Sequence, residues 1–320
     1  MEKWTAEHMP DQNGRTALVT GSNSGLGYEC ALALARKNAQ VVMAIRNVQK
    51  GEEAHRNILA EVPNARLEIL PLDLGNLESV RQAAATFLEQ HAHLHILINN
   101  AGIMAIPRQE TKDGFETQFG VNHLGHFALT GLLLPALLNT PGARVVNVTS
   151  TAQYMGNIPF DDLMGKQSYG RWSAYGQSKL ANVLFTFELQ RRLERANARV
   201  ISVVAHPGFA ESNLRSTTNA HSGGGLEQVI FNVADRLIAQ PGSQGAWPML
   251  YAATAPGVQG GEHYEPHFLK TRGYPVKNPA VKRAYDEQVA ARLWQVSEEL
   301  TGVQYGALAA APAQSSSVMA

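Results

Sequence analysis

Residues 16–27 read T-A-L-V-T-G-S-N-S-G-L-G, in which an apolar run leads directly into a glycine-rich turn. The next stretch, Tyr28 to Arg36, has the pattern of a helix. Glycines at such a junction let the backbone turn sharply and approach a pyrophosphate, whose charge is stabilised by the N–H groups and dipole at the helix start. The stretch therefore predicts a dinucleotide-binding loop, although glycine-rich turns also occur for purely structural reasons.

Further short apolar runs alternate with amphipathic helical stretches along the chain. This alternation indicates βαβ units and a parallel sheet, and strands that are apolar throughout, such as V-V-M-A-I, are typical of a sheet covered on both faces. We predict an α/β fold, a single-domain Rossmann-type doubly wound parallel sheet with helices on both faces and a ligand beyond the carboxyl ends of its strands. The expected strands are Thr16–Thr20, Gln40–Ile45, Leu67–Leu70, Leu94–Ile98, Arg144–Thr149 and Val200–Ala205.

The 320 residues divide into three predicted parts: an N-terminal extension (1–14), one NAD(P)-binding domain (15–305) and a disordered tail (306–320) rich in Ala, Pro, Ser and Gln. Within the domain, Ser216 to Gly225 is rich in Ser, Thr and Gly and predicts a mobile loop. The single cysteine, Cys30, lies in an apolar helical pattern and is expected to be a buried thiol.

The composition is that of an ordinary globular protein, with 44% hydrophobic residues, 17% charged residues and equal numbers of basic and acidic residues, 27 each. Such a balance gives no support for a nucleic acid or an anionic membrane as partner. The first fifteen residues lack the apolar centre of a signal peptide, and the apolar stretch Leu129 to Leu138 is too short to span a bilayer. We expect a cytoplasmic protein without a membrane anchor.

The end of the second predicted strand bears on the choice of cofactor. NAD-binding folds usually carry an acid there for the ribose 2′-hydroxyl, whereas NADP-binding folds carry a basic residue. This chain has Ile45 and Arg46, and no carboxylate before Glu52, so NADPH is favoured; the alternative is that Arg46 is a solvated surface charge. The glycine-loop residues expected to contact the cofactor are Gly21, Ser22, Asn23, Ser24, Gly25, Leu26 and Gly27.

Tyr175 and Lys179 are four residues apart in a strongly helical stretch and so share one helix face. A tyrosine titrates near pH 10, and a nearby positive charge favours its phenolate, which acid/base chemistry near neutrality requires. The spacing alone is weak, because any helix carries it by chance. Support comes from Ser150 at the end of a predicted strand, and from Asn122 in a helix expected to start near Asp113.

Together these motifs resemble the short-chain dehydrogenase/reductase family over residues 15–300. The similar segments are T-G-S-N-S-G-L-G, L-D-L at Leu72–Leu74, N-N-A-G, V-N-H-L-G-H-F, V-N-V-T-S, Y-G-Q-S-K and H-P-G. The resemblance implies a catalytic tetrad of Asn122, Ser150, Tyr175 and Lys179. Tyr175 would protonate a carbonyl oxygen as hydride arrives from the nicotinamide, Ser150 would orient that oxygen, and Lys179 would bind the nicotinamide ribose.

The same resemblance implies further cofactor contacts, with Asp73 at the adenine and Asn99 near the cofactor. The other contacts implied are Leu74, Ala101, Gly102, Pro207, Gly208 and Ser212. At the last position the most similar branch usually has threonine, so the serine keeps the hydroxyl and loses a methyl group.

Within the family, the chain is most similar to the retinol-dehydrogenase-like and WW-domain-oxidoreductase-like branch. That branch shares N-I-P-F-D-D-L, the segment around Tyr175, and the long gap of 25 positions between Ser150 and Tyr175. Light-dependent protochlorophyllide reductases have a similar layout, but their characteristic cysteines are missing here.

Two further groups of residues are weighed as site candidates. His123 and His126 lie at i and i+3, a spacing that a metal can use, but no carboxylate or cysteine joins them, so we expect no metal. His91, His93 and His95 resemble surface loop residues, and His206 is expected to position a turn. The apolar residues expected to line a lipophilic substrate site, or else to pack the core, are Met104, Ile106, Tyr154, Phe160, Trp172, Phe209 and Leu214.

The predicted function is hydride transfer between NADP(H) and a carbonyl/alcohol pair on a lipophilic or aromatic small molecule. The alternatives are a catalytically silent NADP-binding regulatory or scaffold protein, a protochlorophyllide-reductase-like C=C reductase, and an epimerase or dehydratase. The last is disfavoured by the glycine spacing and the lack of a large C-terminal domain. The family resemblance also implies a homodimer or homotetramer.

Overall fold

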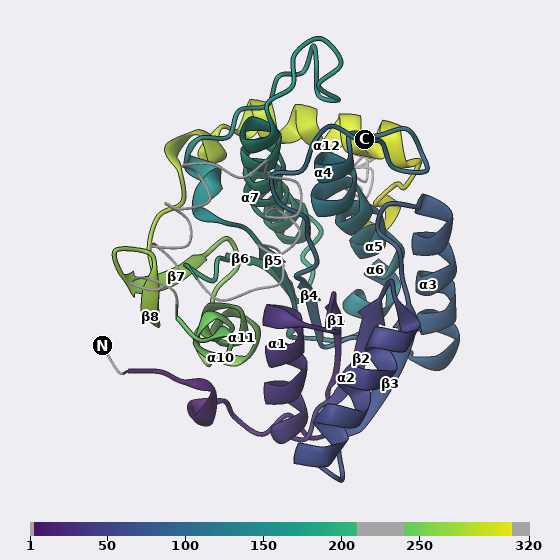
Figure 1. Cartoon of the computed structure of the whole chain (residues 1–320), viewed down its shortest axis with the longest axis vertical. Coiled ribbons are helices and arrows are strands. Elements are labelled where there is room, and N and C mark those ends of the chain that lie inside the picture. Colours follow the sequence, from purple (N-terminus) through teal and green to yellow (C-terminus); the bar gives the residue numbers. More distant parts are fainter. Residues whose placement is uncertain (1–2, 210–239, 309–320) are drawn as a thin grey trace, which may run out of the picture.

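The computed structural model describes residues 3–209 and 240–308, and an eight-stranded sheet forms its centre (Figure 1). The strand order is β3-β2-β1-β4-β5-β6-β7-β8, and all neighbouring strands are parallel except β7 and β8. This order reverses direction between β1 and β4, which confirms the doubly wound arrangement. The strands are β1 Thr16–Thr20, β2 Gln40–Ile45, β3 Arg66–Pro71, β4 Ile96–Asn99, β5 Ala143–Val148, β6 Val200–Ala205, β7 His263–Phe268 and β8 Arg272–Lys277.

The sequence missed β7 and β8. In β7 only the first four residues are buried, and its sequence H-Y-E-P-H-F lacks the continuous apolar run that marks a central strand. Pro266 within it cannot donate a ladder hydrogen bond, which lowers the strand signal further. The two strands pair antiparallel at the sheet edge, so the sheet is mostly parallel, not entirely so.

Helices cover both faces of the sheet. One face packs against α1, α2 and α11, and the other against α3, α5, α6 and α7 (Figure 1). The longer helices are α1 Gly25–Arg36, α2 Val48–Glu61, α3 Leu77–Gln90, α5 Gly125–Leu132, α7 Arg171–Arg195, α11 Trp247–Thr254 and α12 Glu287–Thr301. Shorter ones are α4 Thr117–Phe119, α6 Leu134–Leu138 and α10 Gly242–Gly245, with 3₁₀ turns η1 Ala6–His8, η3 Thr151–Tyr154, η4 Lys282–Tyr285 and η5 Gly306–Leu308.

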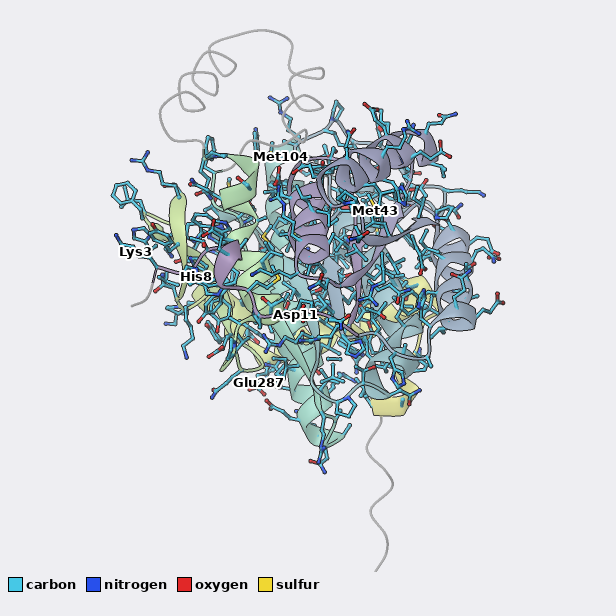
Figure 2. The ribbon with its side chains drawn as sticks, turned by 90° about the horizontal axis from the view of Figure 1, so that it is seen from below. Lys3, His8, Asp11, Met43, Met104 and Glu287 are labelled. Atoms are coloured by element: carbon cyan, nitrogen blue, oxygen red, sulfur yellow. The ribbon has the colours of Figure 1, made fainter. Side chains whose placement is uncertain are left out.

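Two apolar layers sandwich the sheet. Alternate residues of β2 enter opposite layers, so Met43 packs with the α1 side and Val42 with the α5 side. Figure 2 shows Met43 within this interior, where its side chain is fully buried. Because both faces are covered, the central strands need apolar residues at every position, which is why they were visible in the sequence.

The C-terminal helix α12 packs on α7 and α5 (Figure 1). Its Trp294, only 2% exposed, contacts the rings of Phe127, Phe185 and Tyr305 at centroid distances of 5.1, 5.8 and 4.5 Å. The carboxylate of Asp286 caps the helix start by accepting hydrogen bonds from the backbone N–H groups of residues 288 and 289. This helix therefore completes the core on that side of the sheet.

The structure corrects two expectations from the sequence, and a third lies outside the residues that it describes. The helix bearing Asn122 starts at Thr117 instead of near Asp113, because Gly114 has a φ of +82° and the carboxylate of Glu116 accepts from the backbone N–H groups of Gln118 and Phe119. The first three residues of the predicted tail form η5, with Leu308 buried. The loop 216–225 and the rest of the tail lie outside the described residues.

In the described parts of the chain, no helix combines the length and the apolarity needed to cross a membrane.

Candidate active site

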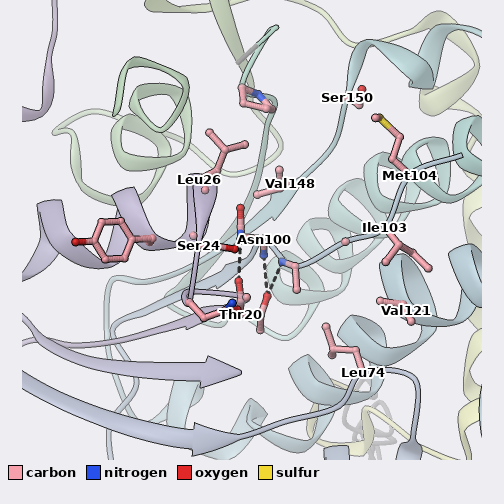
Figure 3. Close-up of a pocket in the computed structure, with 18 of the residues that line it drawn as sticks. Thr20, Ser24, Leu26, Leu74, Asn100, Ile103, Met104, Val121, Val148 and Ser150 are labelled. Carbon is pink, nitrogen blue, oxygen red and sulfur yellow. Dashed lines mark hydrogen bonds between the residues drawn. The ribbon is translucent and has the colours of Figure 1, made fainter. Parts of the chain in front are cut away.

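A cavity of about 1260 Å³ runs along the carboxyl ends of β1, β2, β4, β5 and β6 (Figure 3). Ligand pockets commonly have volumes of about 300–1,000 Å³. This cavity is larger and therefore has room for a dinucleotide and a second molecule. The predicted site residues that line it are Gly21, Asn23, Ser24, Gly25, Leu26, Gly27, Arg46, Asp73, Leu74, Ala101, Gly102, Ser150, Tyr175, Lys179, Pro207 and Gly208.

The glycine loop between β1 and α1 forms one end of the cavity. Gly21 and Gly25 have positive φ angles of 69° and 55°, which L side chains rarely adopt. A Cβ at Gly27 would lie 2.4 Å from the carbonyl oxygen of Gly21, so the helix can start this close to the loop only with glycine there. Ser24 precedes α1 without a side-chain cap, which leaves the first N–H groups of the helix available to an anion. This donor set fits a pyrophosphate.

The ends of β1 and β4 are tied together beside the loop. The hydroxyl of Thr20 accepts hydrogen bonds from the backbone N–H groups of Asn100 and Ala101, both at 2.9 Å, and the Asn100 amide donates to the Thr20 carbonyl at 2.8 Å (Figure 3). Asn100 therefore lines the cavity. Its neighbour Asn99 does not, because its amide is buried in the sheet and donates to Thr130 and Asn147.

Ser22 also lies away from the cavity lining. Its side chain is fully buried, and its hydroxyl has no hydrogen-bond partner among the described residues. Ser212, the last residue in the sequence that was expected to contact the cofactor, lies outside the described residues.

Two cations stand at the rim of the cavity beyond β2. Arg46 and Lys50 are both exposed and both line it. Asn47 accepts a hydrogen bond from the backbone N–H of Lys50 and so starts α2 between the two. Sequence reasoning named Arg46 and missed Lys50, although the helix start that brings them together was visible as Asn47 before a helical pattern.

Tyr175 and Ser150 meet at the opposite end of the cavity. Tyr175, in the second turn of α7, is 5% exposed, and it lines the cavity together with Ser150, which lies just after β5. Burial raises the pKa of Tyr175 to about 12, and the polar side chain of Ser150 opposes that rise. The tyrosine is therefore protonated at neutral pH, contrary to the expectation that the neighbouring Lys179 would favour its phenolate.

Lys179 lies one turn further along α7 and is 4% exposed. Its Nζ donates to the carbonyl oxygen of Val148 at 3.2 Å and lies 5.7 Å from the centre of the Tyr175 ring. Burial lowers the pKa of Lys179 to about 8. The ammonium form therefore still predominates at neutral pH.

Asn122 stands behind the cavity wall, not on it. It lies in a π-helical turn, Gly120–Leu124, and its amide exchanges hydrogen bonds with the backbone of Ile103 and donates to Ser178. Gly102 separates it from the cavity, since a Cβ there would lie 3.1 Å from Asn122 Oδ1 and 3.5 Å from Lys179 Nζ. Asn122 thus fixes the wall next to the lysine.

The histidines named in the sequence form structural hydrogen bonds. His123 bonds to Ser297 and His126 to both Thr20 and the carbonyl of Asn122, so the two rings serve different partners. Burial lowers the pKa of His123 to about 3 and that of His126 to about 4, so both rings are neutral. His91, His93 and His95 lie before β4, at the amino ends of the strands, and each ring has a hydrogen-bond partner.

A buried group that the sequence did not reveal lies under the Pro207–Gly208 turn. Ligand atoms of His206, His263 and Glu265 lie within 4.8 Å of one another. His206 Nδ1 accepts from the Gly208 N–H at 3.0 Å, so its Nε2 carries the proton and donates to Glu265 at 3.1 Å. His206 thus joins Glu265 to the backbone of Gly208 and holds the turn that lines the cavity.

The apolar residues divide between the cavity and the core. Met104, Trp172 and Phe209 line the cavity, whereas Ile106 and Phe160 do not. Ile106 is buried in the protein, and Phe160 packs under Arg292, whose guanidinium carbon lies 4.0 Å from its ring centre. Tyr154 also packs away from the cavity, and Leu214 lies outside the described residues. Lining residues that the sequence missed include Ile103, Val121, Ala152 and Met155.

Comparisons with known proteins agree with this geometry. The family model for short chain dehydrogenases matches residues 15–223. Retinol dehydrogenase 12 of Mus musculus is 42% identical over 292 residues, covering 91% of this chain and 88% of that protein. Polyprenol dehydrogenase of Mus musculus is 40% identical, covering 93% of this chain and 87% of that protein.

A solved structure of an uncharacterized protein from Mycobacterium paratuberculosis has the same architecture. It is 41% identical, superposes with a TM-score of 0.79, and the match covers 95% of this chain and 99% of that one. The chain therefore belongs to the short-chain dehydrogenase family, in its retinol-dehydrogenase-like branch, and is an NAD(P)-dependent oxidoreductase acting on CH–OH groups.

Proposed function

We propose that the protein interconverts a carbonyl and an alcohol on a lipophilic small molecule with NADP(H), and that Tyr175 is the acid/base. One observation carries the proposal: Tyr175 and Ser150 line the same cavity wall, with the Lys179 ammonium buried beside the tyrosine ring. Two converging hydroxyl groups give a substrate oxygen two hydrogen-bond partners at one point.

The chain's residues divide the work of the reduction. The bound cofactor supplies the hydride. Ser150 donates a hydrogen bond that orients the carbonyl oxygen, and Tyr175 transfers its phenolic proton to that oxygen as negative charge develops there. The positive charge of Lys179 stabilises the phenolate that remains.

The raised pKa of Tyr175 supports the reductive direction. A tyrosine whose pKa is about 12 is protonated at neutral pH, and it must be protonated to donate a proton to a carbonyl oxygen. Alcohol oxidation needs the phenolate of Tyr175, so the rate of oxidation should increase as pH rises. Asn122, fixed by Ile103 and Ser178, acts as a positioning residue for Gly102 and Lys179.

The preference for NADPH rests on Arg46 and Lys50. Both cations border the cavity at the end of β2, where the 2′-phosphate of NADP would lie in this fold. A guanidinium forms paired, charge-assisted hydrogen bonds with phosphate, and the ammonium adds a second positive charge. A ribose 2′-hydroxyl offers these two cations no such partner.

The substrate is proposed to be lipophilic because the cavity wall around Tyr175 is apolar. Met104, Trp172 and Phe209 lie on this wall. The names of two relatives, retinol dehydrogenase and polyprenol dehydrogenase, refer to alcohols with long apolar bodies. The wall would bury such a body and leave the oxygen at Ser150 and Tyr175.

A substrate panel tests the proposal. NADPH oxidation is followed by absorbance with retinal, aliphatic aldehydes, aromatic ketones and quinones, and NADH is compared as the donor. We expect turnover of apolar carbonyls with NADPH and a large loss of turnover in Tyr175→Phe. Binding of NADPH without reduction of any member of the panel would contradict the proposal and favour a catalytically silent NADP-binding protein.

A further inference from the structure

Three exposed apolar side chains belong to segments that border the cavity. Among the described residues only six large apolar side chains are exposed, and three of them are Met155 at 57%, Phe268 at 46% and Leu269 at 76%. We call these three the apolar rim. Met155 lines the cavity itself, whereas Phe268 and Leu269 belong to the end of β7 and its turn into β8.

The β7–β8 turn lies at the edge of the sheet that holds the cavity. β7 runs parallel to β6, so its carboxyl end reaches the same edge as the ends of β1, β4, β5 and β6. The backbone N–H of Phe209, a cavity residue, donates to the carbonyl oxygen of Thr271 at 2.7 Å. A Cβ at Gly208 would lie 2.2 Å from the same oxygen. The turn therefore packs directly against the cavity wall.

A second contact ties the turn to the segment that leads into the cavity-lining Met155. The Lys270 ammonium hydrogen-bonds with the Tyr154 hydroxyl and lies 4.4 Å from the centre of its ring. Tyr154 immediately precedes Met155, which lines the cavity. The turn thus spans from Phe209 to the Tyr154–Met155 segment, and the apolar rim continues the apolar lining outward.

The turn has a fixed and unfavourable backbone conformation. Leu269 has a φ of +47° and Lys270 a φ of +60°, although neither is glycine. L residues with large side chains adopt such angles only at an energetic cost. The hydrogen bonds of the turn with Phe209 and Tyr154 hold this conformation, in which the Leu269 side chain is exposed.

We infer that the apolar rim binds the distal part of a long apolar chain on the substrate and makes the enzyme selective for chain length. The inference rests on the proposed function and adds a second contact region, outside the cavity, to it. The three side chains do not touch the reacting atoms; they bury methylene groups that extend past Phe209. Each buried methylene improves binding about fourfold, so a few of them produce a strong preference.

The substrate chain is a better occupant of the rim than a lipid surface or a second protein. The rim is continuous with the cavity through Met155, whereas a separate docking surface would need no such continuity. Its area is also small, since three side chains fall well short of the interface that a stable dimer buries.

The test compares straight-chain aldehydes from butanal to dodecanal in the wild-type protein and in Leu269→Asp. Aspartate tolerates a positive φ better than leucine does, so the turn keeps its conformation. The measured quantity is the ratio of kcat/KM for dodecanal to kcat/KM for butanal. We expect the ratio to fall about tenfold in Leu269→Asp, mainly through KM, because about two methylene contacts are lost. Phe268→Ser/Leu269→Asp should lower it further.

Leu88→Asp is the matched control, since Leu88 is an exposed leucine on α3 that does not line the cavity. Its ratio should equal that of the wild type. A ratio in Leu269→Asp that also equals the wild-type ratio would overturn the inference and leave the proposed function standing. Failure of the wild-type protein to reduce any straight-chain aldehyde would overturn this inference, and failure to reduce any carbonyl of the whole panel would also contradict the proposed function.

Two further measurements distinguish the substrate chain from a lipid surface or a second copy of the protein as the occupant of the apolar rim. Sedimentation with phosphatidylcholine/phosphatidylglycerol vesicles and size-exclusion chromatography are run on the same variants. Vesicle binding, or a dimer, that is lost in Leu269→Asp while the chain-length ratio stays constant would assign the rim to a lipid surface or a second copy and overturn the inference.

Discussion

The Nζ atom of Lys179 donates a hydrogen bond to the carbonyl oxygen of Val148 at 3.2 Å, while it lies 5.7 Å from the centre of the Tyr175 ring. The helix α7 thus delivers a buried ammonium to the end of β5. Burial lowers its pKa from 10.5 to about 8, which means that the folded protein holds this charge at a cost in stability. The proposed reaction needs the Lys179 ammonium, whereas the folded protein would be more stable without this buried charge.

Replacing Lys179 by methionine should therefore stabilise the protein while it abolishes turnover. The Val148 carbonyl keeps its hydrogen bond from Asn182 at 3.1 Å, so no buried acceptor loses its only partner. At pH 7 the free energy of unfolding should rise by on the order of 1–3 kcal/mol. Urea unfolding measures the change, and a variant less stable than wild type at pH 7 would contradict it.

The lowered pKa of Lys179 also predicts how the stability of the protein depends on pH. Its pKa is lower in the folded protein than in the unfolded chain, so the folded state binds fewer protons between about pH 8 and pH 10.5. Its destabilising effect is complete below that window and disappears across it as pH rises. The stability difference between Lys179→Met and wild type should shrink from pH 8 to pH 10.5, and a constant difference would count against the assignment.

Arg46→Ala should weaken NADPH binding far more than NADH binding. Loss of a charge-assisted phosphate contact corresponds to about a 10- to 100-fold rise in Kd, whereas NADH has no 2′-phosphate to lose. Calorimetric titration of both cofactors measures this. Arg56→Ala is the control, because Arg56 is exposed on α2, the helix that follows Arg46, and does not line the cavity. Equal effects on the two cofactors would refute the role of Arg46.

Trp294→Ala should destabilise the fold without altering the site. The ring fills the space between α12, α7 and α5, and its removal from a closely packed aromatic cluster costs about 3–5 kcal/mol. Chemical denaturation gives the loss, and kcat measured well below the unfolding transition should stay close to the wild-type value. A loss below about 1 kcal/mol would show that the α12 side of the core is dispensable.

Local patterns in the sequence predicted the covered strands well and the site only in part. β1, β2 and β6 have the predicted bounds because each is buried on both faces. The positions of Asn99 and Asn100 were not predictable, since only the end of β4 decides which amide turns toward the cavity. The π-helical turn around Asn122 has no sequence signal, and Ile106 and Phe160 pack against partners distant in the chain.

The rate of carbonyl reduction by Tyr175→Phe, at saturating NADPH and with the best substrate of the panel, tests the central claim most directly. The substitution removes one hydroxyl and keeps the ring, so NADPH should bind as it does to the wild type. We predict that kcat falls by about 100- to 10,000-fold, as expected for the loss of a general acid. An unchanged kcat would contradict the assignment of Tyr175 as the proton donor.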